Sequence, residues 1–179
     1  KDVLGTTLKE FDILVIRSAT KVNADILDQA EGGRLKLIIR AGVGIDNIDV
    51  PYATQKGIVV KNTPNSSSES VAELAIGHMF ALARFIAISN CTMRDGQWNK
   101  KQYEGIELGG KTLGIVGMGR IGKALAKKAE ALGMKVVYND MFGKQAELSY
   151  EFLQLDELLR TSDFISLHVP YDKNKGSLI

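Results

Sequence analysis

The chain has little of several features that mark other classes of protein. It contains one cysteine, Cys91, in 179 residues. A single thiol excludes a disulfide within the chain and a metal site built from several cysteines, and reducing, cytoplasmic surroundings are the default expectation. The 23 lysines and arginines nearly balance the 21 aspartates and glutamates. No basic block occurs, so we expect no nucleic acid among its partners.

Long apolar runs are also missing. The longest apolar region, residues 71–88, is interrupted by Glu73, His78 and Arg84, whereas a membrane span needs about 20 nearly uninterrupted apolar residues. We interpret this region as a buried helix and expect no membrane partner. Residues 1–10 are polar and charged, unlike the apolar segment of a secretory signal.

What the chain does contain is a regular alternation of short apolar segments and helical patterns. Asn23 and Asp49 are expected to cap helices, the second with Pro51 in its first turn and Gly57 after its end. Strands are expected at residues 13–16, 37–39, 58–60, 113–116, 135–139 and 164–167. The alternation predicts an α/β fold with parallel sheets and helices on both faces.

Residues 62–65, Asn-Thr-Pro-Asn, interrupt this alternation and are a candidate hinge between residues 1–65 and 66–179. A helix is predicted from about Glu69 to Arg94, ending at Asp95-Gly96. Its apolar residues cover more than one stripe, which is typical of a helix packed between two domains or two subunits. A later helix is expected over residues 157–160 with Asp156 as its cap.

The motif that carries chemistry is the glycine turn of residues 117–122, between a predicted strand and a helix predicted over residues 121–132. Gly117 permits the tight turn, Gly119 lets the backbone approach a pyrophosphate, and Gly122 allows the helix to pack closely on the strand. The free amides at the helix N-terminus then face the phosphate charge. The alternative is a glycine-rich turn in an α/β domain that binds nothing.

Asp140 strengthens the dinucleotide interpretation. It follows Gly117 by 23 residues and comes directly after the strand expected at residues 135–139. An acidic residue at this place binds the ribose hydroxyls of a dinucleotide. Because its carboxylate would repel a 2′-phosphate, NAD is favoured over NADP as the cofactor.

Three segments, residues 40–49, 62–65 and 110–122, together resemble the D-isomer-specific 2-hydroxyacid dehydrogenases. Within this family, residues 17–22 and Arg40 look most like the members that oxidise 3-phospho-D-glycerate. The resemblance implies two doubly wound domains, both incomplete here, with a cleft between them. Residues 1–65 would form a flavodoxin-like substrate domain and residues 66–179 a Rossmann NAD-binding domain, in which residues 66–95 are an interdomain or dimerisation helix.

The resemblance also implies which residues bind the ligands. In the substrate domain, Arg17, Ser18 and Arg40 would hold the phosphate and carboxylate of the substrate, and the amides around Val43 and Gly44 would lie beside the carboxylate and the nicotinamide. Arginine suits this role because its planar guanidinium makes charge-assisted, often bidentate bonds to oxyanions, although a surface ion pair is the ordinary role of a single arginine. The implied cofactor contacts are Gly117, Gly119, Arg120, Ile121, Gly122, Asp140, Val43, Val169 and Pro170.

Three reactive side chains receive no catalytic role. His168 ends a predicted strand, but the family's acid–base histidine lies far downstream, so we expect a structural or backbone-positioning role. His78, on the long predicted helix, is expected to be packed or at an interface. Cys91 has no basic neighbour in the sequence and is expected to be inert.

In the family an arginine polarises the substrate carbonyl, and a histidine paired with a glutamate transfers the proton. The resemblance places all three after residue 179, and a first strand and helix of the substrate domain before residue 1. The chain does not begin with Met, and we expect it to be trimmed at both ends. No catalytic residue is assigned, and these 179 residues alone are expected to be inactive.

The leading hypothesis is an enzyme that oxidises 3-phospho-D-glycerate to 3-phosphohydroxypyruvate with NAD, the entry to serine biosynthesis, as a homodimer or homotetramer. A glyoxylate or hydroxypyruvate reductase is the first alternative. A non-catalytic, corepressor-like NAD-binding protein is the second. Use of residues 69–94 mainly as a dimerisation module would complement the enzyme hypothesis.

Overall fold

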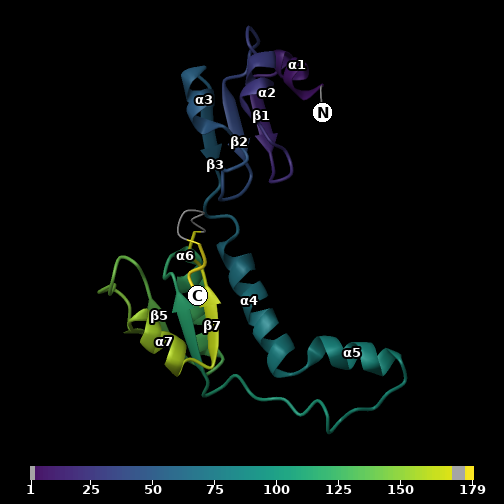
Figure 1. Cartoon of the computed structure of the whole chain (residues 1–179), viewed down its shortest axis with the longest axis vertical. Helices are drawn as coiled ribbons and strands as arrows, with labels where there is room; N and C mark the ends of the chain where they lie inside the picture. Colours follow the sequence, from purple (N-terminus) through teal and green to yellow (C-terminus); the bar gives the residue numbers. More distant parts are fainter. Residues whose placement is uncertain (1–2, 171–175) are drawn as a thin grey trace. The chain divides into compact units, whose positions relative to one another are not determined.

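The computed structural model describes residues 3–170 and 176–179. The chain forms two compact units, the first ending at Ser67 and the second beginning at Ser68 (Figure 1). This division falls two residues after the one expected from the sequence at 65/66. Each unit is built around its own parallel sheet.

The first unit contains a three-stranded parallel sheet with the order β1-β2-β3. Its elements are α1 (Leu4–Thr7), a 3-10 helix (Leu8–Glu10), β1 (Ile13–Ile16), α2 (Ala24–Gln29), β2 (Leu37–Arg40), α3 (Val50–Gln55) and β3 (Val59–Asn62). The predicted parallel sheet is therefore confirmed. Both predicted caps are present, because the side chains of Asn23 and Asp49 accept hydrogen bonds from Ile26 N and Tyr52 N.

The described helices of this unit cover one face of its sheet, so the prediction of helices on both faces is wrong for this unit. Ile16 and Ile38 point into a core that also contains Leu27 of α2 and Ala53 of α3. The opposite face carries Ile13, Val15 and Val59, each at least half exposed within the described chain. Because Ile16 pairs with Arg40, and Arg40 with Asn62, all three strands end at the same edge.

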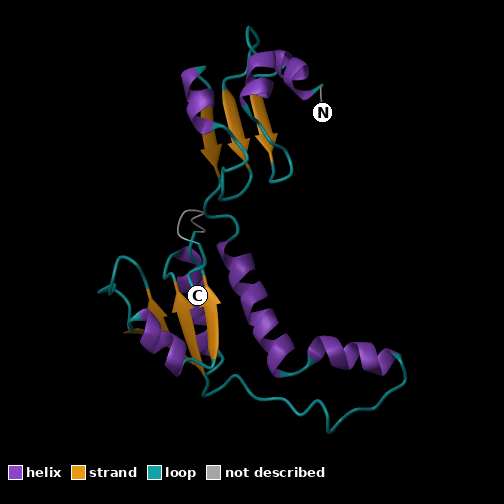
Figure 2. Cartoon of the chain, in the orientation of Figure 1, coloured by secondary structure: helices purple, strands orange, loops and turns teal. Residues whose placement is uncertain are grey.

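The second unit contains a four-stranded parallel sheet with the order β6-β5-β4-β7, and Figure 2 draws the strands in orange. Its strands are β4 (Thr112–Val116), β5 (Lys135–Asn139), β6 (Glu151–Phe152) and β7 (Phe164–Leu167). Its helices are α4 (Ser68–Ala83), α5 (Ile86–Arg94), α6 (Arg120–Ala131) and α7 (Leu155–Thr161). One core joins α4 and α6 to one face of the sheet. On the other face, Leu158 of α7 packs against Val116 and Val137.

The prediction of one helix over residues 69–94 is wrong. Helix α4 ends at Ala83, and α5 begins at Ile86 after a bend of 60°. Phe85 has a left-handed backbone, with φ of 55°. The Ala83 carbonyl, which a continuous helix would bond to residue 87, instead accepts the amide of Ile106 at 2.9 Å. The segment after α5 thus donates to the carbonyl that would otherwise have continued the helix.

The expected cap of the last helix is also wrong. Helix α7 begins at Leu155 with Gln154 at its N-cap and no capping bond from a side chain. Asp156 lies inside the first turn, where its negative charge is favourable near the helix N-terminus.

No single helix in the described ranges is both long and apolar enough to cross a membrane, and the pair α4 and α5 meets that measure only when its two bent members are taken together.

Candidate functional site

The glycine turn lies between β4 and α6, as expected, and two of its glycines are required by the fold itself. Gly117 has φ of 95°, and a Cβ there would lie 2.5 Å from the carbonyl oxygen of His168. A Cβ on Gly122 would lie 2.4 Å from the carbonyl oxygen of Gly117. Side chains at these positions would overlap backbone atoms, so both glycines serve the close packing of turn, strand and helix.

Gly119 differs from Gly117 and Gly122, the other two glycines of the turn. A Cβ built on it meets no described residue within 4 Å, its φ is an ordinary −76°, and it is exposed. Nothing in the described chain therefore requires glycine here. A bare backbone facing open space is suited to the close approach of a ligand, and the pyrophosphate of a dinucleotide fits that requirement.

The start of α6 supplies donors beside Gly119. The first bond of the helix runs from Lys123 N to Gly119 O at 2.9 Å, and no side chain caps the N-terminus. The amides of Arg120 and Ile121 precede that bond and have no acceptor within the helix. Free amides at the positive end of a helix favour a bound phosphate, so the turn fits the group that the sequence predicted for it.

Asp140 follows β5 and lies against the turn. Its Oδ2 accepts a hydrogen bond from Met118 N at 2.8 Å, and its Oδ1 accepts one from Phe142 N at 3.0 Å. Each carboxylate oxygen keeps a further lone pair for a ribose hydroxyl. The position of Asp140 at the strand end was predicted, whereas its bond to Met118 was not.

The end of β7 borders the same turn. His168 N donates to Val116 O at 2.8 Å, and its Nε2 lies 2.9 Å from the Ser166 hydroxyl. Burial lowers the pKa of His168 below its ordinary value of 6.5, which favours a neutral ring. Val169 follows it, with a methyl group 2.9 Å from where a Gly117 Cβ would stand. His168 thus has the contacts of a residue that positions backbone, and Pro170 lies exposed beyond Val169.

In the first unit, the residues predicted to bind the substrate gather along the carboxyl edge of the sheet. Arg17 and Ser18 follow β1, Arg40 ends β2, and Val43 and Gly44 lie in the loop after β2. Arg17 and Ser18 are exposed, and Arg40 is partly buried. Ligands of parallel α/β sheets bind at this edge.

Arg40 is folded back over its own loop. Its Nη1 donates to Ala41 O at 3.3 Å, and a Cβ on Gly42 would lie 1.3 Å from that same nitrogen. Its Nε is buried and has no hydrogen-bond partner in the described ranges. Glycine at position 42 therefore makes room for the guanidinium.

Two asparagines hold these loops, and sequence reasoning gave them no role. Asn47 Nδ2 donates to Arg17 O at 3.1 Å and to Thr20 O at 2.7 Å. Asn62 Nδ2 donates to Val43 O at 2.7 Å. Both lie in segments that carried the family resemblance, and this was the only signal available for them.

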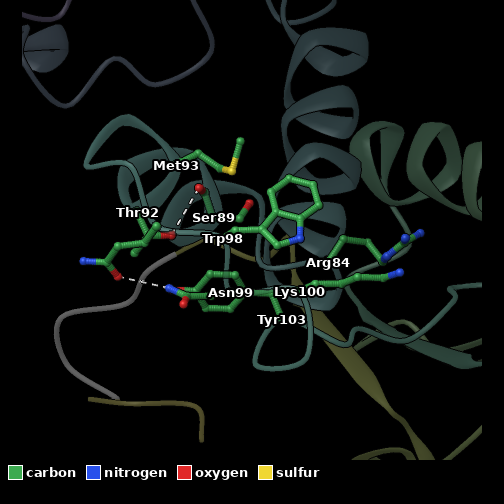
Figure 3. A pocket seen from close by; sticks show the side chains of 9 residues that line it. Arg84, Ser89, Thr92, Met93, Trp98, Asn99, Lys100 and Tyr103 are labelled. Carbon is green, nitrogen blue, oxygen red and sulfur yellow. Dashed lines mark hydrogen bonds between the residues drawn. The ribbon is translucent and has the colours of Figure 1, made fainter.

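Other candidate groups lie apart from these edges. His78 and Cys91 are exposed on α4 and α5, so His78 is not packed within its own unit. Among residues 3–170 and 176–179, no cluster of three His, Cys, Asp or Glu side chains could hold a metal ion. A cavity of about 250 Å³ lies beside α5 (Figure 3), and its lining includes none of the predicted site residues. It is bordered by Arg84, Ser89, Thr92, Met93, Gln97, Trp98, Asn99, Lys100 and Tyr103.

Residues 76–179 match the family model for the NAD-binding domain of D-isomer-specific 2-hydroxyacid dehydrogenases. The whole chain is 50% identical to a hydroxypyruvate reductase of Thermotoga maritima, of which it covers 58%. Over 95% of its length it is 47% identical to a D-3-phosphoglycerate dehydrogenase of Methanocaldococcus jannaschii, of which it covers 33%.

A solved D-lactate dehydrogenase of Aquifex aeolicus, in complex with NAD and lactic acid, superposes with a TM-score of 0.78. It is 36% identical, and the match covers 95% of this chain and 51% of that one. The chain thus spans only part of each relative. The α/β class and the expectation of an NAD-binding domain are confirmed.

Proposed function

The chain belongs to the D-isomer-specific 2-hydroxyacid dehydrogenase family, and from that premise we propose that it is part of an enzyme that transfers a hydride between a D-2-hydroxy acid and NAD. Bound NAD would supply the hydride acceptor. The chain's own residues would bind its pyrophosphate at Gly119, Arg120 and Ile121 and its ribose at Asp140. Asp140 would also exclude NADP, because the 2′-phosphate would meet a carboxylate.

We propose that the substrate is 3-phospho-D-glycerate. The observation that carries this proposal is the gathering of Arg17, Ser18 and Arg40 at one sheet edge. A substrate with both a phosphate and a carboxylate needs more than one cationic partner, and two guanidinium groups meet that need. The similarity to D-3-phosphoglycerate dehydrogenases supports the same choice.

A second candidate is hydroxypyruvate reduction, which the 50% identical Thermotoga maritima relative favours. Hydroxypyruvate lacks the phosphate, so one arginine for its carboxylate would suffice.

Steady-state kinetics on the complete protein that contains this chain separate the candidates. We expect a much higher kcat/KM with NAD and 3-phospho-D-glycerate than with unphosphorylated 2-hydroxy acids, glyoxylate or hydroxypyruvate. Efficient turnover of hydroxypyruvate with none of the phosphorylated acid would overturn the substrate proposal. NAD binding without turnover of any of these acids would instead support a non-catalytic, corepressor-like protein.

We also propose that residues 66–95 mediate a homodimer. Helix α5 buries none of its residues in the described chain, and Leu82 of α4 is 73% exposed. Ile86 and Ile88 extend this apolar surface. In a homodimer, the same elements of the second copy would cover it. In analytical ultracentrifugation we expect a dimer that Ile88→Glu dissociates, whereas a wild-type monomer at micromolar concentration would contradict the proposal.

A further inference from the structure

We propose that Gln145 is a positioning residue that fixes the NAD-binding turn to the loop carrying the ribose-binding carboxylate. This inference rests on the proposed NAD site and adds a residue to it. Gln145 belongs to no glycine motif and lies 27 positions from the residue that it contacts in the turn. The observations begin at Met118, the residue between Gly117 and Gly119.

Both backbone polar groups of Met118 are bonded to the loop that follows β5. Its N–H donates to Asp140 Oδ2 at 2.8 Å, and its carbonyl accepts Gln145 Nε2 at 3.2 Å. The Met118 side chain is completely buried. The residue between the two glycines is therefore held from both sides by residues 140 and 145.

Gln145 is itself held by the core of the unit. Its backbone amide donates to the hydroxyl of Tyr138 at 2.7 Å. Tyr138 is fully buried in β5, with its ring edge-on to Phe152 at 5.5 Å between centroids. A buried hydroxyl needs a partner, and here its partner fixes the place from which the Gln145 side chain reaches the turn.

The same loop is attached to α6 at two other points, which do not touch the turn. Glu147 pairs with Lys123 at 3.0 Å, and Tyr150 donates to Glu130 at 3.0 Å. These bonds anchor the loop to the helix. Among the described residues, only Asp140 and Gln145 bond this loop to the peptide groups on either side of Met118.

The turn and the carboxylate therefore form one preorganised surface. A dinucleotide that bonds to both spends less of its binding free energy on ordering them. The same bonds keep the Asp140 carboxylate where a 2′-phosphate would meet it. Loss of the Gln145 side chain should weaken binding of the adenosine half of the cofactor and reduce the preference for NAD over NADP.

The test compares Gln145→Ala and Tyr138→Phe with Tyr150→Phe, a control that removes a bond of the same loop remote from Met118. Calorimetric titrations of the full chain would use NADH, ADP-ribose and NADPH, with thermal unfolding measured in parallel. We expect both Gln145→Ala and Tyr138→Phe to weaken NADH and ADP-ribose binding by about three- to tenfold, the worth of one net hydrogen bond. The ratio of NADPH to NADH dissociation constants should fall, and Tyr150→Phe should bind like wild type.

An unchanged affinity and an unchanged ratio in Gln145→Ala would overturn the inference, as would an equal loss in Tyr150→Phe. If Gln145→Ala unfolds the second unit, Gln145→Met, which keeps the side-chain length without the donor, is judged by the same criteria. Failure of the wild-type chain to bind NADH would instead count against the proposed NAD site.

Discussion

The two units each carry candidate site residues at the carboxyl edge of their own sheet, and these two edges are built in different ways. In the second unit the candidate surface is backbone. Added Cβ atoms on Gly117 and Gly122 would lie 2.5 and 2.4 Å from carbonyl oxygens, and Met118 between Gly117 and Gly119 is bonded through both its N–H and its carbonyl. In the first unit the surface is made of side chains. Arg17 and Ser18 are exposed, and Asn47 holds the loop that carries them. Substitution of the outer glycines, Gly117 and Gly122, should lower the free energy of unfolding, whereas substitution of the exposed side chains of the first unit should weaken only binding.

The largest effect is expected for Gly122→Ala. The added methyl group would stand 2.4 Å from the Gly117 carbonyl oxygen, and relief of this overlap should cost the second unit about 2–3 kcal/mol of unfolding free energy. Thermal or denaturant unfolding measures this loss. The matched control is Gly77→Ala in α4, where a Cβ meets nothing within 4 Å and a stabilisation of up to about 1 kcal/mol is expected.

If Gly122→Ala were as stable as Gly77→Ala, α6 would not pack closely against the turn at Gly122. The proposed difference between the two sheet edges would then be contradicted.

The next effect concerns the first unit. Arg17→Ala removes an exposed guanidinium, so unfolding should hardly change. If Arg17 binds a substrate oxyanion, KM for 3-phospho-D-glycerate should rise about 10- to 100-fold, the worth of one hydrogen bond to a charged group. Steady-state kinetics of the complete protein measure it. The control is Lys21→Ala, which removes an exposed cation four residues after Arg17. It should leave KM nearly unchanged.

Equal changes in KM for Arg17→Ala and Lys21→Ala would mean that the edge attracts the substrate only by its general charge, with no defined arginine contact.

The smallest effect is a dependence of stability on pH through His168. Burial lowers its pKa in the folded chain below the ordinary 6.5, so the unfolded chain binds the proton more tightly. His168 therefore contributes stability that is fully present above about pH 6.5 and is lost as the pH falls through the lower, folded pKa. Unfolding measured at pH 7.5 and pH 5.5 should show a smaller difference between the two pH values in His168→Asn than in wild type. An identical difference in the two proteins would contradict this assignment.

The sequence predicted those features that depend on neighbouring residues. Asn23 and Asp49 cap their helices because a cap bonds only three residues away. The glycine turn and Asp140 were predicted because their spacing alone defines a strand, a turn and a second strand end. The arginine edge was reached through family resemblance, since a single exposed arginine has no distinguishing pattern.

The features that were missed depend on residues distant in the sequence. The break after Ala83 needs the amide of Ile106. The bond from Gln145 to Met118 needs the loop after β5 to return to the turn. Neither the hydrophobic periodicity of the sequence nor the secondary-structure propensity of its residues predicts these contacts, because they form only once the sheet and its helices are assembled.

The most direct test of the account is a titration of Gly119→Val with NADH, together with its thermal unfolding. A Cβ on Gly119 meets no other residue within 4 Å in the part of the chain that the structure describes, so the added side chain should act mainly by obstructing a ligand. We expect a folded protein that loses no more than about 1 kcal/mol of unfolding free energy through the poorer N-cap of α6, and an affinity for NADH reduced by at least about tenfold, or about 1.4 kcal/mol. NADH binding as tight as that of wild type in a folded Gly119→Val protein would contradict the placement of the pyrophosphate at this turn.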